Sequence, residues 1–296
     1  MARGKRAVSG WIVLDKPLGM TSTQAVGKVR WLYGAEKAGH AGTLDPLATG
    51  LLPIALGEAT KTVPFVQDGR KRYRFEIAWG TETTTDDAEG EITATSPVRP
   101  DENAVLAALP SFTGAILQRP PAFSAIKVDG ERAYDLARAG AAVELAPRPV
   151  TIDELVVLEH DTERSRFEMA CEKGTYVRAL ARDLALALGT RGHVSLLRRT
   201  AVGGFSEANA ITLEAIETAA DRDNLLAPPA VALRHLRELR VSADDVALLR
   251  NGGAVLLRGS DAPVSLDAAW ASFAGAAIAV GSVRAGHFQP SRVLKG

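Results

Sequence analysis

The stretch around which the chain is organised is Gly39-His40-Ala41-Gly42-Thr43-Leu44-Asp45-Pro46-Leu47-Ala48-Thr49-Gly50-Leu51-Leu52-Pro53. It holds three glycines and two prolines in fifteen residues, a content that excludes a regular helix. Because most of the stretch is apolar, we expect an irregular backbone packed against a core rather than a solvated loop. This backbone would hold one carboxylate, Asp45, and one imidazole, His40.

Two roles are open for Asp45. Proline at position 46 pushes the residue before it away from helical backbone angles and toward extended ones. A single carboxylate on a stiff apolar loop suits a nucleophile or a general base. An aspartate before a proline is also a common helix entry, in which Asp45 would cap a short helix that begins at Pro46. Because capping aspartates far outnumber catalytic ones, spacing alone favours the cap.

The whole chain has the composition of an ordinary globular protein. Of its 296 residues, 46% are hydrophobic and 24% are charged, which allows one large domain or two unequal ones. The single cysteine, Cys171, excludes an internal disulfide, and the basic start followed by the short run 11–14 contains no signal-peptide core. No apolar window is long enough to span a bilayer, so we expect a cytoplasmic protein without membrane contact.

The charge balance argues mildly against a nucleic-acid-binding protein. Lysine and arginine together number 35, and so do aspartate and glutamate. Segregation of the charges would remove this objection, and charged residues do cluster, at Arg70-Lys71-Arg72 with Arg74 and at Asp86-Asp87. Arg234, Arg237 and Arg240 are three apart, a spacing that predicts one side of a helix. Such runs are more often solvated faces, so composition alone does not indicate RNA.

Periodicity predicts a mixture of strands and helices. The clearest strand runs from Arg72 to Trp79, with its aromatic residues and Ile77 on one face. A helix is predicted from a cap at Thr21 or Ser22 as far as Tyr33. Further predicted elements are helices over 101–109 and 133–139, strands over 148–158 and 194–202, and a helix after Gly174 with Leu180, Leu184 and Leu188 on one stripe. Since no regular βαβ rhythm appears, we predict an α+β fold around a mainly antiparallel sheet.

Several motifs together carry a resemblance to a known family. Gly39 to Gly50 resembles the signature of the bacterial TruB-type tRNA pseudouridine synthases. The supporting motifs are Asp15-Lys16-Pro17-Leu18-Gly19-Met20-Thr21-Ser22, Lys71-Arg72-Tyr73 and Lys173-Gly174-Thr175-Tyr176-Val177-Arg178. All of them keep the family's order, and together they cover most of residues 10–205.

The resemblance implies a domain organisation and an activity. A catalytic domain with a mixed, mainly antiparallel sheet would occupy residues 10–235, after a basic tail at 1–9 and before a small PUA-like β-barrel at 236–296. Within it, residues 118–146 would form an insert that embraces the TΨC arm of tRNA. The enzyme would isomerise uridine 55 of that arm to pseudouridine, as a monomer with no protein partner, metal or cofactor. The sequence itself shows no metal-ligand spacing and no dinucleotide loop.

The resemblance also assigns site residues. Its catalytic set would be Asp45 as the carboxylate, Arg178 as the cation beside it, Tyr73 as the ring that stacks on the target base, and Tyr176 next to the aspartate. Its substrate contacts would be His40 in the place of the flipped nucleotide, Leu197 beneath the uracil, and Lys16 and Lys61 at phosphate. Without the motifs, Arg178 would be a surface arginine, Tyr73 and Leu197 core residues, and His40 a satisfied histidine.

One position departs from the family pattern. After the Tyr73 strand the family has Gly, two variable residues and Thr-Asp-Thr, whereas this chain has Thr84 in the place of the aspartate. A supporting hydrogen bond or charge is therefore lost or moved, and Asp86-Asp87 follow closely. Two alternatives to a stand-alone enzyme stay open: a guide-RNA-dependent relative, and an RNA-binding tRNA chaperone with the same fold.

Overall fold

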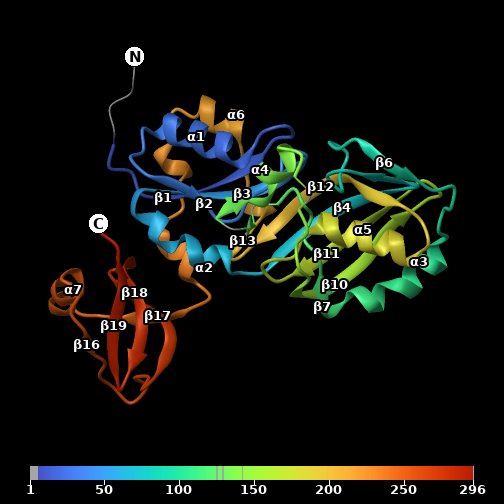
Figure 1. The fold of residues 1–296 in the computed structure, drawn as a ribbon. Helices are drawn as coiled ribbons and strands as arrows, with labels where there is room; N and C mark the ends of the chain where they lie inside the picture. The colour runs from blue at the N-terminus through green and yellow to red at the C-terminus, as the bar shows by residue number, and fades with distance from the viewer. Residues whose placement is uncertain (1–5, 125, 129, 142, 296) are drawn as a thin grey trace. The chain divides into compact units, whose positions relative to one another are not determined.

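The computed structural model describes residues 6–124, 126–128, 130–141 and 143–295 (Figure 1). Part of the predicted basic tail, and positions 125, 129 and 142 of the predicted insert, lie outside the described residues. By its contacts the chain divides into two compact units, which are described here one at a time. The first unit comprises residues 1–44, 51–68 and 202–296, and the second comprises residues 45–50 and 69–201.

The first unit begins with a group of strands whose side chains are mostly apolar. Its strands, in the order β14-β1-β3 with β2 antiparallel to β3, are β14 (Ile211–Thr212), β1 (Gly10–Lys16), β3 (Ala48–Leu56) and β2 (Ala38–His40). The first three residues of β3 belong to the second unit. Four consecutive side chains of β1, from Trp11 to Leu14, are buried, and the Trp11 ring lies 5.5 Å from that of Phe205 between centroids. Burial of this aromatic pair anchors the core of the unit.

Helices surround this sheet. They are α1 (Ser22–Tyr33), η1 (Gly57–Thr62), α2 (Val63–Gln67), η3 (Glu207–Asn209), α6 (Leu213–Thr218), η4 (Asp223–Leu225) and η5 (Pro229–Leu233), with the short strand β13 (Phe205–Ser206) among them. The predicted start and end of α1 are confirmed. The Thr21 hydroxyl accepts a hydrogen bond from the Gln24 amide, and Gly34 ends the helix at a φ of 60°.

The C-terminal part of the first unit is a curled five-stranded sheet (Figure 1). Its order is β15 (Arg237–Arg240), β17 (Leu266–Phe273), β18 (Ala276–Arg284), β19 (His287–Val293) and β16 (Val255–Leu256), with α7 (Ala243–Arg250) packed against it. This half-barrel is consistent with a PUA-like fold. The predicted arginine-lined helix is wrong, because Arg237–Arg240 is a strand that pairs in parallel with β17. The predicted domain boundary at residue 236 stays a prediction.

The second unit is built on an antiparallel sheet. Its strand order is β12 (Gly192–Val202), β4 (Lys71–Trp79), β11 (Arg164–Cys171), β10 (Arg148–His160) and β7 (Gly114–Gln118). The predicted alternation of β4 is confirmed, because Tyr73, Phe75, Ile77 and Trp79 are all buried. Phe75 stacks on Phe167 of β11, with ring centroids 5.2 Å apart. Since β3 and β12 run parallel while the neighbours of β11 run antiparallel, the predicted mixed, mainly antiparallel sheet is confirmed.

The remaining elements of the second unit are short, apart from one helix. They are β5 (Thr81–Thr83), β6 (Ile92–Thr95), α3 (Glu102–Ala108), η2 (Leu109–Phe112), β8 (Lys127–Val128), β9 (Glu131–Arg132), α4 (Ala133–Arg138) and α5 (Val177–Ala187). Helix α5 buries Leu180 and Leu184 completely and packs against β4. Arg178 is the second residue of this helix and is buried in its first turn.

Candidate active site

The backbone around Asp45 is more regular than the sequence predicts. Residues 38–40 and 48–56 are strands, and Asp45, Pro46 and Leu47 form the turn that leads into the second of them. The amide of Ala48 donates to the Asp45 carbonyl at 3.0 Å. No helix begins at Pro46, so the capping role is wrong and the carboxylate of Asp45 is left for another partner.

Two features of the sequence place this turn. In the first unit, the Ser22 hydroxyl donates to the Leu44 carbonyl at 2.9 Å and accepts from the Leu44 amide at 2.8 Å, which holds the residue directly before Asp45. In the second unit, Gly50 pairs with Arg199 of β12 at a φ of 93°. A Cβ atom at Gly50 would lie 2.2 Å from the Arg199 carbonyl oxygen, so only glycine allows the two strands to approach this closely.

The carboxylate of Asp45 forms an ion pair with Arg178. Arg178 Nη2 lies 2.9 Å from Asp45 Oδ2. The Arg178 side chain is 6% exposed, whereas the Asp45 side chain is 37% exposed. The cation is therefore part of the protein interior, and the carboxylate that it holds is open to a ligand.

Arg178 is itself held by several groups. Its Nη1 donates to the Thr85 carbonyl at 2.8 Å, and its Nη2 donates to the Phe123 carbonyl at 2.9 Å. Its Nε lies 3.6 Å from Asp87 Oδ2, and the Asp87 side chain is 3% exposed. Because these partners hold the guanidinium in a single orientation, Arg178 fixes the orientation of the Asp45 carboxylate and also balances its charge.

Asp87 is a site residue that the sequence motifs did not assign. The sequence feature that could have indicated Asp87 is the acidic pair Asp86-Asp87, because it closely follows Thr84, which replaces the family's aspartate. Thr84 itself is exposed and bonds to Glu91, whose amide donates to the Thr84 hydroxyl at 3.1 Å. The departure from the family pattern therefore lies away from Arg178, which takes its second carboxylate from Asp87.

Two tyrosines lie in the field of Asp45. Tyr73, on the buried face of β4, is 9% exposed, and the charges of Arg199 and Asp45 act on its hydroxyl. Burial raises the pKa of the Tyr73 phenol, so it keeps its proton at neutral pH. Tyr176 precedes α5, and burial raises the pKa of its phenol too. The predicted catalytic set is thus brought together within the second unit.

The predicted substrate-binding residues divide between the units. Leu197, 8% exposed, pairs with Ala48 across β12 and β3 and so lies close to the Asp45 turn. His40, Lys16 and Lys61 lie in the first unit. Lys16 is fully buried and donates to the carbonyls of Pro17 and Met20, and Lys61 donates to Glu58 and to the Val293 carbonyl. Their predicted roles at RNA stay predictions.

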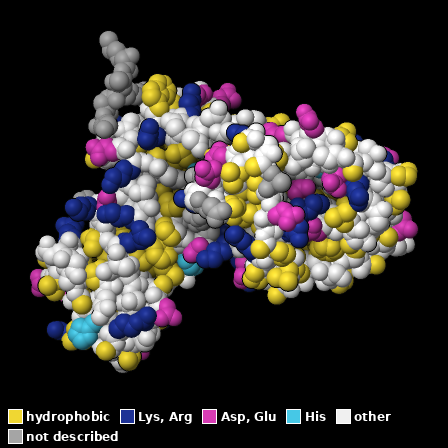
Figure 2. All heavy atoms as spheres, in the orientation of Figure 1, with side chains coloured by type: hydrophobic (Ala, Val, Ile, Leu, Met, Phe, Trp, Pro, Cys, Tyr) yellow, Lys and Arg dark blue, Asp and Glu magenta, His cyan; other side chains and the backbone are white. Residues whose placement is uncertain are grey.

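The arginines of the basic cluster at 70–74 are all paired with carboxylates in the fold. Its three arginines pair with carboxylates of β10 and β11: Arg70 with Asp153, Arg72 with Glu154 and Glu168, and Arg74 with Glu168. Lys71 donates to the Gly69 carbonyl. Figure 2 shows the same mixture of dark blue and magenta over the second unit, whereas dark blue predominates on the visible face of the first. Three carboxylates therefore offset most of the charge of these four basic side chains, which leaves the cluster little positive charge to favour RNA.

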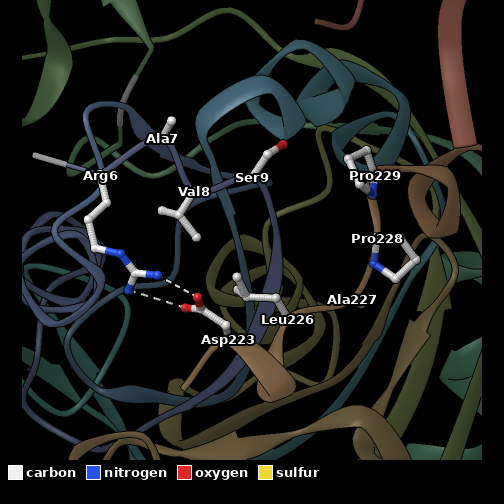
Figure 3. A pocket seen from close by; sticks show the side chains of 9 residues that line it. All are labelled: Arg6, Ala7, Val8, Ser9, Asp223, Leu226, Ala227, Pro228 and Pro229. Atoms are coloured by element: carbon white, nitrogen blue, oxygen red, sulfur yellow. Dashed lines mark hydrogen bonds and ion pairs between the residues drawn. The ribbon is translucent and has the colours of Figure 1, made fainter. Parts of the chain in front are cut away.

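The first unit contains a pocket that is separate from the predicted site residues. An open pocket of about 410 Å³ in the first unit is lined by residues 6–9, by Asp223 and by residues 226–229, and Arg6 and Asp223 of this lining form an ion pair (Figure 3). It contains none of the predicted site residues. Over the described residues, no three His, Cys, Asp or Glu side chains group closely enough to hold a metal ion. None of the helices in the described ranges combines the length and apolar character that a bilayer crossing requires.

Comparison with known proteins gives a consistent result. The family described as TruB family pseudouridylate synthase, N-terminal domain, matches residues 30–177, and a tRNA pseudouridylate synthase B C-terminal domain matches residues 178–239. The tRNA pseudouridine synthase B of Bradyrhizobium diazoefficiens is 55% identical over 99% of this chain and 87% of its own length. That of Mesorhizobium japonicum is 49% identical over 99% of both chains.

Solved structures agree on the fold. The Cbf5 chain of a Cbf5-Nop10-Gar1 complex aligns with a TM-score of 0.72 at 26% identity, over 97% of this chain and 84% of that one. An archaeal Nop10-Cbf5 complex aligns with a TM-score of 0.74 at 23% identity, over 97% and 86%. The paired carboxylate of Asp45, the sheet that carries it and these similarities lead to one conclusion: the chain belongs to the TruB family of pseudouridylate synthases.

Proposed function

We propose that this enzyme isomerises uridine 55 in the TΨC loop of tRNA to pseudouridine, with Asp45 as its catalytic carboxylate. The observation that carries the proposal is the pair of Asp45 with Arg178, in which the carboxylate is accessible and the cation is buried. A guanidinium fixed in the interior holds the carboxylate in one orientation, which both nucleophilic attack and proton abstraction require.

The proposed reaction is an isomerisation that needs no co-substrate. The bond between C1′ and N1 breaks and a bond between C1′ and C5 forms, so no atom is gained and no net oxidation occurs. The C5 proton leaves and a proton returns to N1. The ionised Asp45 fits attack at C6, attack at C1′ or abstraction of a sugar proton, and Arg178 fixes its orientation in each case.

The target nucleotide has to leave its stack before it reaches Asp45. Unstacking a base costs a few kcal/mol, and an aromatic stack returns ~1–3 kcal/mol. We assign this contact to Tyr73, and the effect of the Asp45 charge on its hydroxyl supports the assignment. Leu197, in register with Ala48 beside the Asp45 turn, supplies an apolar contact beneath the uracil.

The proposal includes how the tRNA is held. The insert at 118–146 embraces the TΨC arm, and His40 and Lys61 contact the RNA. Lys16 is left out of these contacts, because its side chain is fully buried and donates to the carbonyls of Pro17 and Met20. The enzyme works in the cytoplasm as a monomer without a protein partner. The relatives at 49% and 55% identity, which are named tRNA pseudouridine synthase B, support tRNA as the substrate.

Tritium release tests the proposal. Unmodified tRNA carrying C5-tritiated uridine is incubated with the purified chain alone, beside a matched transcript with cytidine at position 55. We expect release from the first tRNA and none attributable to position 55 from the second. Asp45→Asn should abolish release while tRNA binding is retained, because the amide keeps the size of the carboxylate and removes its charge.

The other outcomes separate the alternatives. Release that requires added guide RNA and partner proteins would identify a guide-dependent enzyme. Tight tRNA binding with no release under either condition would identify an RNA chaperone. Equal release from both transcripts would overturn position 55 and leave the activity standing.

A further inference from the structure

Helix α5 carries a second, partly buried arginine one turn after Arg178. Residues four apart on a helix lie on the same face, so Arg182 follows Arg178 along the same side of α5. The Arg182 side chain is 18% exposed, far less than a solvated arginine. The proposed reaction does not use it.

Arg182 joins the same two segments that Arg178 joins. Its Nη1 donates to Asp86 Oδ2 at 2.9 Å, and its Nη2 donates to the Arg119 carbonyl at 2.7 Å. Arg178 likewise bonds to the loop at Thr85 and to the segment at Phe123. The two arginines therefore form parallel links from α5 to the loop 85–87 and to residues 119–123.

The loop side of these links is firmly placed. The Val194 amide donates to the Asp86 carbonyl at 3.1 Å, and the Ala88 amide donates to the Val194 carbonyl at 3.0 Å. Asp86 adopts a φ of 58°, which aspartate tolerates better than most residues. Its side chain is 11% exposed and points to Arg182. The loop 85–87 is thus hydrogen-bonded to β12, and the nearly buried carboxylate of Asp86 faces Arg182 of α5.

The other side of the links is the first arm of the predicted insert. At its start, the Gln118 side chain donates to the Tyr176 carbonyl at 3.1 Å and accepts from the Tyr176 amide at 2.8 Å. Arg119 and Phe123 follow, bonded through their carbonyls to Arg182 and Arg178. Arg182 thus lies at the root of the insert, on the helix that also supplies the partner of Asp45.

We propose that Arg182, with Asp86 as its counter-ion, is a positioning residue for tRNA binding: it seats the first arm of the insert against the loop that supports Arg178. The inference rests on the proposed function, because tRNA is the ligand that the insert takes. A planar guanidinium is suited to this role because its two Nη atoms reach a carboxylate and a carbonyl at once. Loss of Arg182 should weaken tRNA binding while the chemical step, which depends on Arg178, is largely kept.

The test compares Arg182→Met with Asp86→Asn and the double variant. Methionine keeps an unbranched side chain and removes every donor. The matched control is Asp183→Asn, which removes the negative charge beside Arg182 Nε, keeps an oxygen that accepts its hydrogen bond, and leaves the loop and the insert untouched. Three quantities are measured: the Kd for unmodified tRNA by filter binding, the single-turnover rate at saturating tRNA, and the rate of tryptic cleavage after Lys127 and Arg138.

We expect Arg182→Met to raise the Kd about tenfold, a size typical of coupled contacts, and to change the saturating rate by less than about threefold. Cleavage within the insert should accelerate while cleavage elsewhere is unchanged. Asp86→Asn should act in the same direction, and the double variant should resemble Arg182→Met because the two residues act as one unit. Asp183→Asn should match the wild type.

Three results would overturn the inference: an unchanged Kd, an unchanged rate of cleavage in the insert, or a lower saturating rate at an unchanged Kd. If Arg182→Met unfolds the protein, cleavage will accelerate throughout the chain. In that case the Kd and the insert cleavage of Asp86→Asn, which keeps the size of the side chain, test the inference. If the wild type releases no tritium, the proposed activity fails, yet the Kd and the cleavage pattern still decide the role of Arg182.

Discussion

Asp86→Asn should change how the stability of the enzyme depends on pH. Burial raises the pKa of the Asp86 carboxyl from 3.8 to about 6, although Arg182 and Arg178 act in the opposite direction. Asp183 and Glu82 also face it and raise the pKa further. Asparagine has the same shape and does not titrate, so the difference between the two proteins isolates this carboxyl.

The sign follows from which state binds the proton. Between the unfolded pKa of 3.8 and the folded pKa of about 6, the folded chain keeps a proton that the unfolded chain has released. Stability therefore falls as the pH rises through this window and stays constant above it. The separation of the two pKa values corresponds to ~3 kcal/mol in full, and to ~2 kcal/mol between pH 4 and pH 7.5.

The assay is urea unfolding of both proteins at half-unit steps from pH 4 to pH 7.5. We expect the free energy of unfolding of the wild type, relative to Asp86→Asn, to fall by ~2 kcal/mol across this range, with most of the change below pH 6.5. Asp183→Asn tests the neighbouring charge: because Asp183 raises the pKa of Asp86, its removal should make the fall in stability with pH smaller. A difference curve that is flat, or that rises with pH, would refute the reasoning that burial outweighs the two arginines at Asp86.

Three further predictions concern the site and the sheet. Gly50→Ala should lower the melting temperature strongly or prevent folding, because its Cβ would meet the Arg199 carbonyl at 2.2 Å; a melting curve like that of the wild type would show that the strands can separate there. Arg178→Met should lower the free energy of unfolding by ~3–5 kcal/mol and abolish tritium release, because it leaves the buried Asp87 carboxylate without this cation; urea unfolding and the release assay check both, and retained release would exclude Arg178 from the site. Arg74→Ala should cost less than ~1 kcal/mol and leave the salt dependence of tRNA binding unchanged, since Arg74 is 56% exposed and Glu168 already pairs with it; filter binding over a salt series checks this, and a flatter slope would show that the cluster does face RNA.

Local patterns were sufficient for many of the elements. Strand β4 could be predicted from the alternation of its side chains, and the start of α1 from the Thr21 hydroxyl that caps it. Both signals act over only a few residues. The arginines at 234, 237 and 240 show where such patterns fail. Their spacing matches a helix, yet the backbone of Arg237–Arg240 is committed to hydrogen bonds with β17, a strand distant in sequence.

The sequence by itself determined the family, through the glycine- and proline-rich stretch around Asp45 and the order of the motifs that accompany it. It also indicated Arg178 and Tyr73 as site residues, though only through that resemblance. The tertiary structure alone decided which charges meet. Arg178 pairs with Asp45 and Asp87, and Arg182 pairs with Asp86 and Asp183. The arginines of the cluster at 70–74 pair with carboxylates of other strands. Ion pairs form between groups that the sheet brings within a few ångströms, and separation along the chain carries no information about that distance.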